Sequence, residues 1–188
     1  MRALPPLAIA LTLAIAAPTM ATDQSKTSAG QNANKAISST GTLGFIGLGL
    51  LLPFVQDGGD GFMHSFRAAD STVLSVGLAY GLQQLTHEKR PNSNAHDSFP
   101  SIHASAAFAI ATMQAQYHPW EAPLWYAGAA VIGVSRVQLR EHHWGDVIAG
   151  AALGFGTARL ELSSHRGLLI YPFVGDSGDM GLVLSAQF

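Results

Sequence analysis

The sequence predicts an all-α protein, an antiparallel helical bundle of about five core helices with a short C-terminal β-hairpin. Apolar residues make up 48% of the chain and charged residues only 12%, which excludes a disordered chain. From Thr42 onward the apolar residues fall into Ala- and Gly-rich segments separated by turn-forming residues, as in a bundle. Alternation of apolar and polar residues at the C-terminus predicts the hairpin.

The N-terminus is typical of an export signal. Arg2 provides a positive start, residues 7–17 are apolar, and Ala21 is a small residue at the expected cleavage point. The apolar run is short of the ~20 residues that a spanning helix needs, although an uncleaved anchor is the alternative. Residues 22–40 are polar, small and aperiodic, and predict a flexible linker. We therefore expect a signal peptide over 1–21, and an exported protein of the periplasm or cell envelope.

Five apolar segments predict the helices, and breakers separate the first four of them. The stretch 57–61 (Asp-Gly-Gly-Asp-Gly) ends the first, the polar loop 91–100 follows the second, and His118-Pro119 ends the third. Asp70 or Ser71 is the expected N-cap of the second helix. The predicted helices are 42–55, 71–85, 101–116, 121–137 and 144–162, within a helical domain over 41–165.

The last residues, 166–188, predict the hairpin. Residues 168–174 are rich in β-formers, 175–181 are turn-like, and 182–188 alternate. Most helical segments are shorter than ~20 residues, and the third carries polar Ser105, Thr112 and Gln114. We therefore expect a soluble or peripherally attached bundle, with insertion into a membrane as the alternative.

Charge and cysteine content exclude several classes of function. The net charge is −2, which argues against a nucleic-acid partner. The chain has no cysteine, which excludes thiol catalysis, disulfides and cysteine-based metal sites. Eight histidines against ten lysines and arginines are the first sign of chemistry.

Three polar clusters lie at predicted helix ends. The first contains Arg90, the second is Pro-Ser-Ile-His over 100–103, and the third runs from Ser135 to Asp146; no Lys or Arg lies between Arg90 and Arg136. In an antiparallel bundle all three clusters meet at one end. They predict an anion pocket made of two guanidiniums, helix N-termini and a serine hydroxyl.

His142 and Asp146 are spaced to share one helical face. Asp146 can hold one ring nitrogen of His142 and leave the other as a nucleophile. A metal cluster of Glu141, His142, His143 and Asp146 is the alternative interpretation of these residues.

The three clusters together resemble the signature of the type-2 phosphatidic acid phosphatases, a superfamily that also contains the vanadium haloperoxidases. The third motif, Ser-Arg, five residues, His, three residues, Asp, is present in full from Ser135 to Asp146. The second, Pro-Ser-Gly-His, has Ile102 in place of glycine, and the first, Lys, six residues, Arg-Pro, has Gln83 in place of lysine.

The resemblance implies roles for these residues. His142 would attack phosphorus and carry a phosphohistidine, Asp146 would orient it, and His103 would protonate the leaving group and then activate water. No metal or other cofactor is implied, because arginines supply the positive charge. The implied phosphate ligands are Arg90, Arg136, Ser101, the backbone N–H near Ile102, and Gln83.

The sequence thus predicts a metal-independent phosphatase acting on a lipid phosphate, an isoprenoid pyrophosphate or a small phosphoester. Gln83 and Ile102 depart from the family pattern, and they motivate an alternative: a catalytically weak anion- or lipid-binding bundle of the envelope. A vanadate-dependent haloperoxidase is a further alternative, disfavoured by the small size of the chain.

Overall fold

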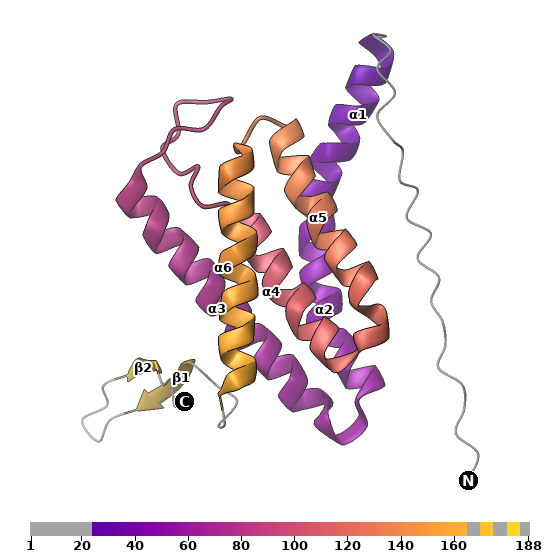
Figure 1. The fold of residues 1–188 in the computed structure, drawn as a ribbon, viewed down its shortest axis with the longest axis vertical. Helices are drawn as coiled ribbons and strands as arrows, with labels where there is room; N and C mark the ends of the chain where they lie inside the picture. Colours follow the sequence, from indigo (N-terminus) through magenta and orange to yellow (C-terminus); the bar gives the residue numbers. More distant parts are fainter. Residues whose placement is uncertain (1–23, 165–169, 175–179, 185–188) are drawn as a thin grey trace.

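The protein is an antiparallel bundle of α-helices in which α4 lies at the centre (Figure 1). The structure, a computed structural model, describes residues 24–164, 170–174 and 180–184; the expected signal peptide over 1–21 lies outside them. The helices are α1 (Gln24–Ala36), α2 (Thr42–Gln56), α3 (Gly61–Thr86), α4 (Ile102–Tyr117), α5 (Ala122–Gln138) and α6 (Trp144–Ser163). The shorter elements are a π-helical turn (Ile37–Gly41) and two 3-10 turns (Gly58–Asp60 and Pro119–Glu121).

Two strands, β1 (Ile170–Val174) and β2 (Met180–Leu184), follow the bundle and pair antiparallel, with Ile170 opposite Leu184. The rest of 166–188 lies outside the described residues.

Small residues let the helices approach α4 closely. Most of the core cluster is alanine, with Ile110, Met113 and Trp125 as its largest members. A Cβ atom on Gly150 or Gly154 of α6 would run into backbone carbonyl oxygens at the start of α4 or within it. These two glycines therefore allow α6 to lie directly against α4, which brings the N-terminal ends of both helices together.

The prediction of a flexible linker over 22–40 is wrong for the described residues from 24 onward. They form α1, which continues through the π-helical turn into α2 and projects past the bundle in Figure 1. The segment is polar, but its Ala, Gln and Lys residues are good helix formers. Tertiary contact adds to this: Ser38 is buried, and its Oγ accepts a hydrogen bond from Arg136 of α5.

The predicted start of the second core helix is also wrong. Asp70 and Ser71 do not cap a helix; both are buried inside α3, which begins ten residues earlier at Gly61. Arg67 explains the continuation, since its Nε donates to Oε1 of the fully buried Glu161 on α6 at 2.9 Å. Ser71 itself is satisfied within the helix, its Oγ donating to the carbonyl of Ala68. The predicted bounds of the other four helices lie within one or two residues of those observed.

Candidate active site

The residues of the three sequence motifs lie at one end of the bundle. The loop 87–101 leaves α3 and enters α4, the loop 139–143 joins α5 to α6, and both lie at the upper end in Figure 1. His103 is in the first turn of α4 and Arg136 in the last turn of α5. The antiparallel order of the helices thus brings together residues that are far apart in the sequence.

His142 is buried and is oriented by a backbone carbonyl. Its side chain is 1% exposed, and Nδ1 lies 2.7 Å from the carbonyl oxygen of Ser98. A carbonyl can only accept, so Nδ1 carries the proton and the neutral ring keeps its lone pair on Nε2. Burial lowers the pKa of His142, as does the neighbouring Arg136, and both favour this neutral form. Nε2 is therefore the atom available for nucleophilic attack.

Asp146 acts on this histidine mainly through Ser98. Its Oδ2 is 3.6 Å from Nδ1 of His142, too long for a hydrogen bond, but accepts from Oγ of Ser98 at 2.5 Å. The same oxygen accepts from the backbone N–H of His143 at 2.8 Å, and the Asp146 carbonyl accepts from the N–H of Ser101 at 2.9 Å. The carboxyl group thus joins the loop 87–101 to the start of α6, which differs from the direct contact expected from the spacing.

Ser98 was missed by the sequence analysis. It lies in a polar loop without periodicity, and no motif includes it. The structure makes it a fully buried residue whose carbonyl holds His142 and whose hydroxyl holds Asp146. Only the folded loop reveals these contacts, so the sequence carried no signal for them.

Both expected phosphate-binding arginines face carboxylates. Arg90 donates from Nε and Nη2 to the two oxygens of Asp97 at 2.7 and 2.9 Å. Arg136 is buried and pairs with Glu141 through Nη2, while Arg90 Nη1 lies 3.7 Å from the same Glu141 oxygen. The buried Nε of Arg136 has no hydrogen-bond partner among the described residues. The site therefore contains an unused donor within a pair of guanidiniums.

His103 is neutral at pH 7 in the ligand-free protein. Burial, and after it the neighbouring Arg136, His142 and Arg90, together lower its pKa from 6.5 to about 4. A bound anion acts in the opposite direction, because a negative charge nearby favours the protonated ring. His103 is thus placed to take up a proton when an anion enters the site.

The remaining predicted ligands belong to the start of α4. Ser101 is fully buried and caps the helix, its Oγ accepting from the N–H of Ala104 at 3.5 Å. Ile102 is the first helical residue, so its N–H has no partner within the helix. Gln83 is buried in α3 and donates from Nε2 to the carbonyl of Pro100 at 2.9 Å. In this structure Gln83 holds the loop that enters α4.

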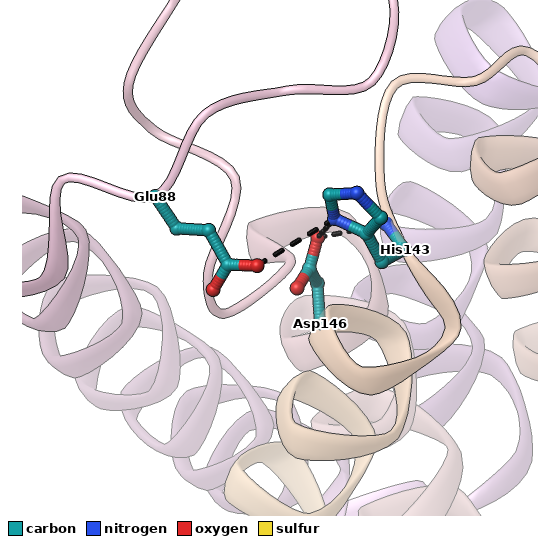
Figure 2. Close-up of side chains that lie close together, drawn as sticks. All are labelled: Glu88, His143 and Asp146. Atoms are coloured by element: carbon teal, nitrogen blue, oxygen red, sulfur yellow. Dashed lines mark hydrogen bonds and ion pairs between the residues drawn. The ribbon is translucent and has the colours of Figure 1, made fainter.

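Three donor groups that can ligate metals lie close together, as Figure 2 shows. One donor atom each from Glu88, His143 and Asp146 lies within 4.8 Å of the others. Two of these groups are already engaged in hydrogen bonds. The His143 side chain accepts from the backbone N–H of Asp146, and the Asp146 carboxylate accepts from the backbone N–H of His143. This reciprocal pair is a capping box at the start of α6. The residues therefore fit a helix cap better than a metal site.

Comparison with known proteins identifies the family. A model of the PAP2 superfamily matches residues 64–168, so this chain belongs to that superfamily, as the three motifs predict. Among curated proteins, the Lipid A 1-phosphatase of Porphyromonas gingivalis is 39% identical over 69 residues. That match spans 35% of this chain and only 16% of the relative.

Two solved structures are similar to this one. Aquifex aeolicus LpxE aligns with a TM-score of 0.55 at 20% identity, over 73% of this chain and 93% of that chain. This likeness shows that the fold is shared. The transmembrane PAP2 type phosphatidylglycerolphosphate phosphatase from Bacillus subtilis aligns with a TM-score of 0.41 at 21% identity, over 73% and 85% of the two chains.

Proposed function

We propose that this protein is a metal-independent phosphatase that hydrolyses the phosphomonoester of a membrane lipid through a phosphohistidine on His142. Membership in the PAP2 superfamily supports the class of reaction. The observation that carries the mechanism is the hydrogen bond from His142 Nδ1 to the Ser98 carbonyl, because it leaves Nε2 as the nucleophile. Arg136, with its unused Nε, and Arg90 supply positive charge for the phosphoryl oxygens.

The reaction has two steps. In the first, Nε2 of His142 forms a bond to phosphorus, the bond to the alkoxide breaks, and a protonated His103 donates its proton to the alkoxide. In the second, neutral His103 accepts a proton from water, the resulting hydroxide attacks phosphorus, and the bond from phosphorus to Nε2 breaks. Inorganic phosphate leaves, and His103 is again protonated. The proton that His103 needs at the outset is taken up with the anionic substrate, since the anion raises the pKa of the ring.

Apolar surfaces near the site support a lipid as the substrate. A groove of about 170 Å³ lies between α4, α5 and α6, and all its lining residues are apolar. It includes Trp144 and Val147, which directly follow His143 and Asp146 in the chain. We propose that the alkyl chain of a substrate whose phosphoryl group lies at His142 occupies this groove. The other lining residues are Phe108, Ala130, Gly133, Val134, Ile148 and Ala151.

Membrane association is supported by two further observations. Among the described residues, the helical stretch Ser28–Gln56 is long and apolar enough to cross a membrane. Phe54, Phe62 and Phe66 of α2 and α3 form an exposed aromatic cluster. Large exposed apolar clusters mark surfaces that contact lipid or protein. We propose that the stretch anchors the protein in the cell envelope, after export directed by residues 1–21.

The decisive experiment measures hydrolysis of an aryl phosphate and of a long-chain lipid phosphate by the purified full chain in EDTA. We expect turnover of both, with the larger kcat/KM for the lipid. His142→Ala is expected to abolish turnover, whereas His96→Ala, an exposed histidine of the loop 87–101, leaves it unchanged. Rapid quench of the unchanged protein should trap an acid-labile phosphoenzyme.

Three outcomes would contradict the proposal in different ways. Turnover that survives His142→Ala would exclude the phosphohistidine. Turnover that EDTA abolishes would exclude metal independence. Binding of vanadate without any turnover would favour the alternative, a catalytically weak anion-binding bundle.

A further inference from the structure

The site already contains a carboxylate between its two arginines. Oε2 of Glu141 pairs with Nη2 of Arg136 and lies 3.7 Å from Nη1 of Arg90. A phosphoryl oxygen bound by both guanidiniums would require the same position. The Glu141 side chain is 26% exposed, so solvent reaches it, whereas the Arg136 side chain is only 6% exposed.

Glu141 satisfies Arg136 only in part. It uses Nη2, Ser38 accepts from Nη1, and the buried Nε stays without a partner among the described residues. A guanidinium binds phosphate best through two parallel N–H donors, and Nε with Nη2 forms one such pair. A phosphoryl group that replaced Glu141 could use both donors, which gives the exchange a driving force.

The positive charges of the site are already matched by carboxylates without any ligand. Arg90 and Arg136 carry two positive charges, Asp97 and Glu141, which pair with them, carry two negative charges, and the buried Asp146 adds a further carboxylate next to His142. Gln83 is neutral where the family motif has a lysine, and burial together with the neighbouring cations keeps His103 and His142 largely neutral. A dianion therefore meets no excess of positive charge in this protein.

We propose that Glu141 is a specificity-determining residue: its carboxylate holds the phosphoryl position on Arg136 until a substrate displaces it, and its charge disfavours dianionic phosphoryl groups relative to monoanionic ones. This inference rests on the proposed function, because it takes Arg90 and Arg136 as the phosphoryl ligands. Displacement moves the carboxylate only a short way. Glu141 directly precedes His142, whose ring is held by the Ser98 carbonyl, so only the side chain can swing outward. The negative charge thus stays near the bound anion.

The test is the affinity for inorganic phosphate, measured by isothermal titration calorimetry with the full chain. Phosphate is mostly monoanionic at about pH 5.5 and mostly dianionic at about pH 8. Glu141→Gln removes the charge and keeps the shape. We expect it to tighten phosphate binding about tenfold at the higher pH and about threefold or less at the lower pH, because repulsion grows with the charge of the ligand.

Two further variants keep the result interpretable. Glu88→Gln removes a carboxylate at the same end of the bundle that contacts His143 and not the arginines, and is expected to change the affinity less than about twofold, as for an exposed charge. Glu141→Ala removes the charge and the side chain together and serves where Glu141→Gln lowers the melting temperature. The other titratable or charged groups around the anion position are Arg90, Asp97, His103, Arg136, His142 and Asp146, and all are unchanged in these variants.

Each outcome decides between the inference and the proposed function. Unchanged or weaker binding by both Glu141 variants, in a protein that still hydrolyses phosphomonoesters, would overturn the inference and leave the function standing. Equal tightening at both pH values would overturn the charge preference. If neither the unchanged protein nor any of the variants binds phosphate, the anion pocket is disproved, and the proposed function with it.

Discussion

The strongest prediction concerns the route by which Asp146 orients the nucleophile. The spacing of His142 and Asp146 suggests a direct contact, but the structure places Ser98 between them: its hydroxyl binds Asp146 at 2.5 Å, and its carbonyl binds His142 at 2.7 Å. Ser98→Ala removes the hydroxyl and keeps the carbonyl. Asp146→Asn removes the charge and keeps the shape. The two changes and their combination form a double-mutant cycle.

The magnitudes follow from the bond that is lost. A hydrogen bond to a charged group contributes about 1.5–3 kcal/mol, so Ser98→Ala should lower the free energy of unfolding by about that amount. The loss of orientation should lower kcat/KM about tenfold, with KM nearly unchanged, since each factor of ten corresponds to about 1.4 kcal/mol. If Asp146 acts through Ser98, Asp146→Asn costs less in the Ser98→Ala background than in the unchanged protein, by about 1 kcal/mol or more.

The assay is steady-state hydrolysis of an aryl phosphate, together with thermal unfolding of all four proteins. Ser93→Ala is the matched control, because Ser93 lies in the same loop, is exposed, and only accepts a bond from its neighbour Ala95. Additive effects of the two changes on kcat/KM would refute the reasoning and would show that Asp146 acts on His142 directly. Nitrogen NMR of His142 gives an independent check, since a proton on Nε2 would contradict the tautomer argued above.

Three further predictions follow from packing, burial and charge. Gly154→Ala should lower the free energy of unfolding by about 1–3 kcal/mol, because its Cβ would strike the backbone of α4; Gly156→Ala, in open space on the same helix, should be neutral or stabilising. His103 has a lower pKa folded than unfolded, so the unfolded chain binds more protons and stability falls by about 3 kcal/mol between pH 7 and pH 4; His103→Gln should flatten that part of the curve. Gln83→Lys keeps a donor to the α4 loop and adds a cation, so vanadate should inhibit more tightly; weaker inhibition would mean that the charge does not reach the anion.

The sequence predicts most helix bounds because strong local signals lie at them. Ser101, the first residue of the predicted third helix, caps α4, and Pro119 precedes α5 in a short turn. The start of α3 could not be predicted in this way. Asp70 and Ser71 suggest a helix start from their local sequence, but both lie inside α3, where the nearby Arg67 contacts Glu161, 94 residues later. A prediction from local pattern fails where a distant partner satisfies a polar residue.

The same distinction applies to the candidate site. The residues that would react or bind phosphate came from motif spacing, which is a property of the sequence. Their partners Ser98, Asp97 and Glu141 depend on the path of the loops 87–101 and 139–143, which carry no periodicity. The role of Asp146 shows the consequence. The spacing of one helical turn does bring it near His142, yet the hydrogen-bond partner of His142 Nδ1 is the Ser98 carbonyl of the other loop.

In the proposed function, His142 is oriented by one set of contacts and the anion is bound by another. The two sets have no hydrogen bond or ion pair in common. His142 is held by Ser98 and, through it, by Asp146, all within a buried network between the loop 87–101 and α6. The buried guanidinium of Arg136 is held by the half-buried Glu141 of the loop 139–143. The first set is buried and is formed without a ligand, so the proposed function has its nucleophile oriented before substrate arrives. The second set leaves the Nε of Arg136 without a partner among the described residues, and the proposed displacement of Glu141 would use this donor. A protein built in this way can alter the charge of the substrate it prefers, by substitutions around Arg136, without losing the orientation of its nucleophile.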